Sequence, residues 1–355
     1  MKKLYSLLVM ALLVLSIIPV VFATGVGIGV GVDINTEDYA PNVWMCGDRV
    51  LVDDPIQPGL NGANLAERIN NYAFEGESIA WNVLVMDKNG INKVEDVFAT
   101  IGDVQGAGND IEVNCVESTP YSDGLVNASC NARILEESLT GNPIDITGQD
   151  VLRYYTCTLT VETQSSMYGE YWITVEAVDL DGLSGTMAEN EYWFLNPIIT
   201  LEVAGDLVFN NVRPGTDSYS STLLVGNDAD DGSGVILDMF ISGTDFYDSS
   251  SSGAMCPTGN VLDLSAFKYF ATNGAYSTFT NFVKDAEGYA PIKDGSRIDQ
   301  AYEIIGDDKF GAGAYNNGNT LTPGAEMALT FKLTLPEPCN GDFDSGTIYF
   351  WGEAI

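Results

Sequence analysis

Apolar and polar residues alternate along most of this chain in runs of roughly five to ten residues, separated by glycine, aspartate and asparagine. Alternation with a period of two is typical of strands with one buried face. Helical periodicity is confined to Asn64–Tyr72, where Leu65 and Ile69 stand four apart, so we expect one short helix there. In the first half the pattern predicts strands near Val43 and at Ser78–Met86, Val94–Ile101, Ile111–Val116, Tyr154–Glu162, Glu170–Val178 and Tyr192–Leu195.

A domain boundary is predicted at Asn196–Pro197, because proline restricts the residue before it and ends a strand. Between Tyr276 and Thr322 the alternation weakens, which predicts a long loop excursion. Strands of the second half are expected at Ile198–Val203, Leu207–Phe209, Tyr219–Val225, Val235–Ile241, Phe267–Ala271, Met327–Leu335 and Thr347–Trp351. The fold class is therefore all-β, with two tandem Greek-key β-sandwich domains at residues 41–197 and 198–355 and one short helix in the first.

The N-terminus has the three parts of a secretion signal. Two lysines, Lys2 and Lys3, precede an unbroken apolar run, and Val21–Phe22–Ala23 suits signal peptidase. We expect residues 1–23 to be removed and the protein to be extracellular or on the cell surface. An uncleaved anchor is the alternative, since the run is nearly long enough to span a bilayer. Such an anchor is the only membrane contact the sequence predicts.

A ribbon in which glycine alternates with β-branched residues follows the signal, within a predicted N-terminal arm of residues 24–40. Val26, Ile28, Val30 and Val32 fall on one face, because successive side chains of an extended chain point to opposite sides. Three interpretations stay open: an edge strand on its own first domain, a strand inserted into a neighbouring molecule, and a glycine-rich spacer. Each glycine weakens an isolated strand by about 0.5–1 kcal/mol, so the ribbon needs a partner to be stable.

Charge and composition exclude several function classes. The formal charge of −35 excludes nucleic acid as a partner, because binding phosphates requires clusters of lysine and arginine. The chain has no histidine, which removes histidine-based triads and histidine zinc sites. No other catalytic motif is found, so the sequence predicts a protein that is not an enzyme.

Six cysteines without a Cys-x-x-Cys pair, in an exported chain, predict three disulfides. Cys256–Cys339 follows if no bridge crosses between the domains. In the first half three pairings are open, and Cys46–Cys157 with Cys115–Cys130 is the one we favour.

Acidic turns are the candidate metal ligands, and Ca²⁺ is the only cofactor they predict, because it prefers oxygen ligands. Two strands end alike in Asp-x-(Asn/Asp)-Gly, and these turns form one site if they meet at one end of the sandwich. The alternative is a solvated turn in which aspartate only caps the backbone. The candidate ligands are Asp87, Asp179 and Asp181 in the paired turns, Asp228, Asp230 and Asp231 in a second cluster, and Asp342 and Asp344 in a third.

Aromatic runs are the other candidate interaction sites. Trp193 lies between Tyr192 and Phe194, and Trp351 follows Tyr349 and Phe350, so neighbouring rings must face opposite sides. At least one ring in each run is then exposed or in an interface. Trp81 and Trp172 are expected in the core. Asn127 begins the only glycosylation triplet of the chain.

Two segments resemble known surface proteins. Gly169–Gly182, a strand that ends in Asp-Leu-Asp-Gly, resembles bacterial and archaeal immunoglobulin-like surface domains, including the cadherin-like group, and this likeness spans about residues 78–195. Val212–Asn227 and Gly346–Ile355 resemble strands of the camelysin/TasA biofilm-fibre group. The second resemblance implies a fibre-forming sandwich. It does not imply the metalloprotease activity described for camelysin-type proteins, because this chain lacks histidine.

We therefore expect a secreted cell-surface protein with a structural or adhesive role, in its leading form a self-assembling subunit of a surface layer or extracellular fibre. Its expected partners are further copies, other surface proteins or glycans. The alternative is a carbohydrate-binding module that uses exposed aromatics. A glycan-active enzyme with a carboxylate pair is third, since that chemistry needs only two acidic side chains.

Overall fold

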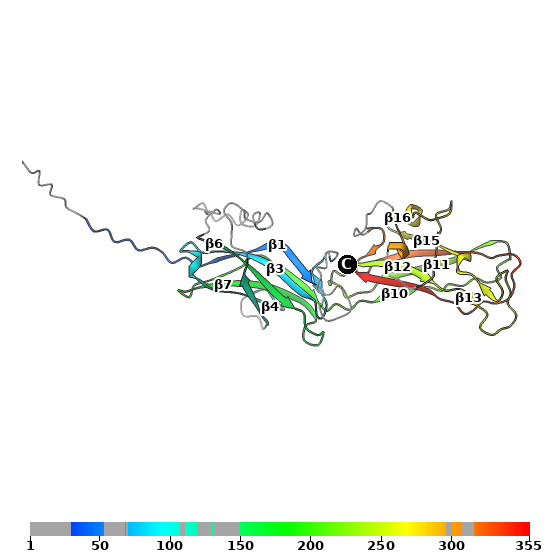
Figure 1. The fold of residues 1–355 in the computed structure, drawn as a ribbon, viewed down its shortest axis with the longest axis horizontal. Coiled ribbons are helices and arrows are strands. Elements are labelled where there is room, and N and C mark those ends of the chain that lie inside the picture. The colour runs from blue at the N-terminus through cyan, green and yellow to red at the C-terminus, as the bar shows by residue number, and fades with distance from the viewer. Residues whose placement is uncertain are drawn as a thin grey trace, which may run out of the picture. The chain divides into compact units, whose positions relative to one another are not determined.

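The computed structural model describes residues 30–52, 68, 70–106, 111–118, 130, 150–295, 300–306 and 316–355. The chain divides into two units, Met1–Asp38 and Tyr39–Ile355, and each is described by itself. The second unit contains two β-sandwiches, so the all-β prediction is confirmed (Figure 1). No helix in the described part of the chain is long and apolar enough to cross a membrane.

The first sandwich has the strand order of an immunoglobulin constant-type domain, in which strands A-B-E-D oppose C-F-G. β1-β3-β6-β5 form one layer and β4-β7-β9 the other, and β5 is hydrogen-bonded to both β6 and β4. β2 adds parallel to β9, and β8 pairs with β7. The strands are β1 (Asn42–Val52), β2 (Tyr72–Ala73), β3 (Ser78–Met86), β4 (Val94–Gly102), β5 (Ile111–Glu117), β6 (Leu152–Thr160), β7 (Gly169–Asp179), β8 (Ser184–Thr186) and β9 (Glu191–Leu195).

β3 is buried on both faces, which explains why its alternation fades toward its end. Trp81, Val83 and Val85 join the core between the layers, as does Val175 of β7. Leu84 and Met86 point the other way, into a second cluster around Trp44. The predicted core position of Trp81 is therefore what the structure shows.

The second sandwich packs a larger sheet, β10-β11-β19-β15-β16 with β17 beside β15, against a smaller one, β18-β12-β20 (Figure 1). Val225, Leu329 and Phe331 from the first sheet meet Leu237 and Met239 from the second in one core. The strands are β10 (Leu201–Ala204), β11 (Asp217–Asn227), β12 (Leu237–Gly243), β13 (Phe246–Tyr247), β14 (Val261–Leu262), β15 (Phe267–Asn273), β16 (Tyr276–Ser277), β17 (Ala290–Pro291), β18 (Thr320–Leu321), β19 (Glu326–Thr334) and β20 (Ile348–Ala354).

Short 3-10 turns occur at η1 (Ile91–Lys93), η2 (Leu264–Ala266), η3 (Thr278–Thr280) and η4 (Gln300–Tyr302). Two of them, with β16, β17 and β18, lie in the excursion predicted between Tyr276 and Thr322.

Two secondary-structure predictions need correction. Most of the predicted helix Asn64–Tyr72 lies outside the described residues, but its last residue, Tyr72, begins strand β2. The predicted strand Leu207–Phe209 is not a strand, because the chain leaves the β10–β11 ladder after Ala204. Its apolar side chains instead line a groove described below.

The disulfides correct the pairing that we favoured in the first half. The structure joins Cys46 to Cys130 and Cys115 to Cys157, in place of Cys46–Cys157 and Cys115–Cys130. The cause is strand pairing: β5 lies beside β6 and sets Cys115 directly opposite Cys157. The Cys256–Cys339 prediction is confirmed.

The two sandwiches share a buried joint within the second unit. Tyr72 and Phe194, from the first sandwich, belong to the apolar core of the second. The Tyr72 hydroxyl donates to the Ile355 carbonyl at 2.5 Å, and Asn70 Nδ2 donates to the Gly234 carbonyl at 2.6 Å. The second sandwich therefore completes its core with side chains from the first.

Removing the Tyr72 side chain should destabilise the second sandwich. We expect Tyr72→Ala to lower the free energy of unfolding by about 3–5 kcal/mol, through a cavity and a lost hydrogen bond. Tyr72→Phe should cost about 1–2 kcal/mol, because it leaves the Ile355 carbonyl without its donor. Urea unfolding would measure both, with the exposed Tyr247→Phe as control. Equal stability of Tyr72→Ala and the parent would contradict a shared core.

Candidate assembly site

The described part of the N-terminal ribbon is exposed. Residues 30–41 carry no strand or helix assignment, and Val30, Val32 and Ile34 are 83%, 76% and 77% exposed. Val26 and Ile28 lie outside the described residues. Which of the three interpretations of the ribbon holds stays a prediction. Three apolar side chains on one face stay available for another surface.

Among the strand edges of the second sandwich that have no neighbour in the described sheets are those of β20 and of part of β11. β20 ends the smaller sheet, beyond β12. β10 pairs with β11 only from Leu224 to Asn227, so the outer edge of β11 from Asp217 to Leu223 has no ladder partner in the described sheet. Unpaired edges offer backbone donors and acceptors to an added strand.

A groove of about 580 Å³ lies in the second sandwich, and no residue of β11 is part of its lining. One wall is the segment 207–214, between β10 and β11, and the other is the segment 339–344, before β20. Between the walls lie core side chains of the larger sheet, among them Phe267 and Leu333. The lining is mostly apolar: Leu207, Phe209, Val212, Pro214, Phe246, Leu262, Phe267, Leu333, Leu335 and Phe343. Its size is that of a pocket that binds a small ligand or a few side chains.

The two acidic turns meet at one end of the first sandwich, which is the condition on which a single site depended. The backbone of Leu180 donates to the Lys93 carbonyl at 2.8 Å, and Lys93 Nζ lies 2.5 Å from Asp181 Oδ2. Gly90 and Gly182 close the turns with φ of 119° and 81°. The likeness of the two turns in the sequence left open whether they meet, and the structure shows that they do.

Asp87 and Asp179 are fully buried in these turns. Asp179 Oδ1 accepts hydrogen bonds from the backbone of Asp181 and Leu183, and Asp87 Oδ1 accepts one from Asn89. Burial raises the pKa of Asp87, and the nearby charge of Asp179 raises it further. Across the described residues, no three acidic side chains are arranged to share a metal ion. Calcium binding at these turns stays a prediction.

The other acidic candidates serve local contacts. Asp230 Oδ2 accepts hydrogen bonds from the Tyr168 hydroxyl at 3.0 Å and the Ile198 backbone at 2.8 Å, so it links the two sandwiches. The neighbouring Asp228 and Asp231 are exposed. Asp344 accepts from the backbone and hydroxyl of Ser249, which lowers its pKa. The structure does not bring Asp228, Asp230 and Asp231 together as one ligand set.

The aromatic predictions are reversed in the first sandwich. Trp193 is 4% exposed in the core, whereas Tyr192 is exposed. Trp172, which we expected in the core, lies opposite Tyr192 on the outer face, with ring centres 5.2 Å apart. The inward positions of β7 belong to Ile173, Val175 and Ala177, so Trp172 falls on the other side.

Trp351, the other aromatic candidate, is half-buried. Its Nε1 donates to Ser242 Oγ at 3.1 Å, and its ring lies 6.0 Å from that of the exposed Tyr349. Its role in an interface stays a prediction. Asn127 lies outside the described residues.

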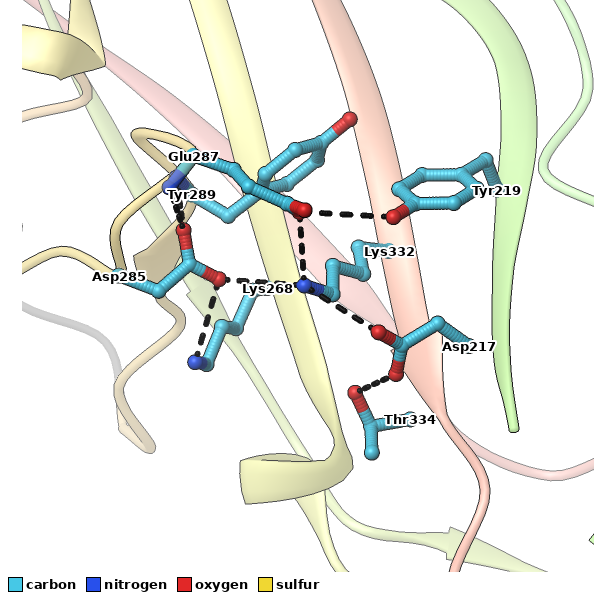
Figure 2. Close-up of polar contacts among 8 residues, drawn as sticks. All are labelled: Asp217, Tyr219, Lys268, Asp285, Glu287, Tyr289, Lys332 and Thr334. Atoms are coloured by element: carbon cyan, nitrogen blue, oxygen red, sulfur yellow. Dashed lines mark hydrogen bonds and ion pairs between the residues drawn. The ribbon is translucent and has the colours of Figure 1, made fainter. Parts of the chain in front are cut away.

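A charged cluster that the sequence did not predict clamps the excursion onto the outer face of the larger sheet (Figure 2). Lys332 Nζ lies 3.0 Å from Glu287 Oε2, 3.3 Å from Asp285 Oδ2 and 3.4 Å from Asp217 Oδ2. Lys268, directly opposite Lys332 on β15, also pairs with Asp285. The sequence contains one indication of this cluster, because the chain has few lysines and two of them lie within apolar strands.

The electrostatics of this cluster favour its charged form. Burial would lower the pKa of Lys332, but its bonds to Glu287 and Asp285 outweigh burial and raise the pKa. Burial would raise the pKa of Asp285, but backbone donors at Tyr289 and Glu287 and the Lys332 ammonium lower it. Lys332 therefore stays ionised. Its ammonium group holds the neighbouring carboxylates and has no free lone pair with which to act as a nucleophile.

A second unpredicted pair of acidic groups, Asp238 and Glu303, joins β12 to the end of η4. Burial raises the pKa of Asp238 to about 6, although Asn319 Nδ2 donates to it at 2.7 Å. Burial and the charge of Asp238 raise the pKa of Glu303 to about 7. These groups were not visible in the sequence, because segments far apart in the chain bring them together.

Comparison with known proteins identifies no family. No protein-family model and no curated protein matches the chain. Among solved structures, one named BspA_C_mut is 10% identical, with 89% of this chain and 95% of that chain covered and a TM-score of 0.33. The C-terminal domain of the AgI/II polypeptide BspA from Streptococcus agalactiae is 9% identical, with 89% and 97% covered and a TM-score of 0.30. A protein described as secreted, from Eubacterium rectale, is 9% identical, with 91% and 68% covered and a TM-score of 0.21. Similarity this remote carries no argument about function.

Breaking the clamp should loosen the excursion. We expect Lys332→Met to lower the free energy of unfolding by about 1–3 kcal/mol, because it leaves three carboxylates facing one another around an unpaired site. Lys268→Met should cost less, because its amine is more exposed and pairs only with Asp285. Thermal unfolding at low and high salt would measure both. A larger loss for Lys268→Met than for Lys332→Met would contradict the central role of Lys332.

Asp238 should make the protein less stable as pH rises. The pKa of Asp238 in the folded protein is about 6, which is above the ordinary 3.8. The destabilisation caused by its buried charge is therefore absent below pH 4, grows as the pH rises through this interval and is complete above pH 6. Asp238→Asn removes this charge and should stabilise the protein at pH 7.5 by about 1–3 kcal/mol, with no gain at pH 4. Urea unfolding at both pH values tests this, with the exposed Asp228→Asn as control. A variant less stable than the parent at pH 7.5 would refute the buried-charge explanation.

Proposed function

We propose that this chain is a secreted structural or adhesive subunit of the cell surface, and that it self-assembles through the ribbon of residues 24–34. The observation that carries the proposal is the exposure of Val30, Val32 and Ile34 on one face of a chain segment without strand partners of its own. Such a segment suits addition to another sheet, where the partner supplies backbone hydrogen bonds and a place for the apolar side chains.

The charge distribution supports contact through the ribbon. Copies that each carry a formal charge of −35 repel one another. Residues Thr24–Val32 contain no charged side chain, so this segment can approach a second copy without adding to that repulsion. Because donor and acceptor would be different surfaces, the contact would repeat from copy to copy and build an open filament or lattice.

The rest of the fold is suited to a load-bearing subunit. Three disulfides cross-link the chain, and the Tyr72 joint ties the two sandwiches together. Lys332 fixes the excursion to the sheet. Each feature resists local unfolding and none of them requires a ligand.

Removal of the ribbon should abolish assembly. We expect oxidised Thr24–Ile355 to form filaments or sheets and Asn35–Ile355 to remain monomeric, by light scattering and negative-stain imaging. A full-length Val30→Asp/Val32→Asp variant should also be monomeric, because it places charges on the apolar face. Repeating the comparison with Ca²⁺ and with chelator tests the acidic turns.

The matched control carries the same two changes at other exposed valines, Val104→Asp/Val116→Asp, and should assemble like the parent. A monomeric Thr24–Ile355 under all conditions would refute self-assembly.

Glycan binding is the second candidate, and two ring pairs on outer faces support it: Trp172 with Tyr192, and Tyr349 with Trp351. Their rings are inclined by 45° and 38°, which makes a poorer stacking surface for a sugar than coplanar rings would. Glycan binding that survives ribbon deletion and is lost in Trp172→Ala would favour this function.

A further inference from the structure

We infer that the groove between segments 207–214 and 339–344 is the acceptor for the ribbon of a second copy of this chain. The inference rests on the proposed self-assembly and adds to it the partner surface. It commits to one occupant, residues 26–34 of another molecule, whose apolar face would enter the groove.

Segments 207–214 and 339–344 line the groove together with Phe267 of β15 and Leu333 of β19. β10 stops at Ala204, while β11 continues to Asp217 and stays paired with β19 on its other side. At the end of β19, Leu333 and Leu335 are left at the floor and side of the groove. Phe209 and Phe343 reach in from the two walls. A segment inserted here would cover apolar side chains that are only partly buried, among them Phe209, Val212 and Phe343.

The shape of the ribbon fits a slot with two walls. One face carries Val26, Ile28, Val30, Val32 and Ile34, and the opposite face carries glycine at every position before Asp33. A glycine face lets a backbone pass close to a wall, because no Cβ stands between them. The apolar face can then turn toward Phe267 and Leu333 while the bare face lies against the wall.

Charge argues for this occupant over an anionic ligand. The lining contains Asp342 and Asp344 and no lysine or arginine. Asp344 stays ionised, since hydrogen bonds from Ser249 lower its pKa. A neutral apolar segment is acceptable beside these carboxylates, and an amino group at Thr24 after signal cleavage would be attracted to them.

The test separates donor from acceptor. Full-length Asp342→Trp keeps the ribbon and fills the groove mouth, and it should be monomeric. Asn35–Ile355 keeps the groove and lacks the ribbon, and it should also be monomeric. A mixture of the two should form a one-to-one complex of two chains and nothing larger, by light scattering, because only one donor and one acceptor remain. Asp231→Trp, at an exposed aspartate elsewhere in the sandwich, should assemble like the parent.

Each outcome has one meaning. Assembly of Asp342→Trp as in the parent, with the parent assembling, would overturn the groove as acceptor and leave ribbon-driven assembly standing. Failure of the two monomers to combine would overturn it also. A parent that is monomeric at every concentration would refute the proposed function together with this inference. Equal thermal unfolding of Asp342→Trp and Asp231→Trp verifies that both variants are folded.

Discussion

The structure depends on one constraint: each β-strand needs a neighbouring strand to pair its backbone N–H and C=O groups. The sequence builds strands almost throughout, and each strand brings a row of backbone donors and acceptors and one apolar face. The first sandwich meets this need by passing β5 from one layer to the other, so that both layers share a strand. The second sandwich meets it only in part, because β10 ends early and leaves β11 partly uncovered. The missing strand at Leu207–Phe209 follows from that early end.

Electrostatics sets the second constraint, since 50 acidic residues face only 15 basic ones. Few carboxylates can have a cation, and several aspartates are instead held by backbone N–H groups, as Asp179 and Asp248 are. Two of the few lysines, Lys332 and Lys268, together form ion pairs with three carboxylates on the larger sheet. The same excess of negative charge makes two copies repel one another. The proposed contact therefore uses the uncharged segment Thr24–Val32.

The positions of Trp172 and Trp193 were mispredicted for one reason. Alternation identifies two faces of a strand but does not identify which face is inside when both carry large apolar residues. Trp172 and Trp193 lie on neighbouring strands and were assigned to the wrong faces for this reason. The cysteine pairing failed similarly: Cys115 is closer in sequence to Cys130, but β5 and β6 are adjacent in the sheet and join Cys115 to Cys157.

The sequence by itself determined the fold class, most strand positions and the Cys256–Cys339 bridge. These depend on periodicity and turn chemistry, which act over a few residues. The tertiary structure alone decided the two other disulfides, the outward position of Trp172, the Lys332 clamp, the Asp238–Glu303 pair and the groove. Each of these joins segments far apart in the chain, and their contact depends on which strands become neighbours. The ribbon stands between the two cases, because its pattern is local and the surface proposed to accept it is not encoded in that pattern.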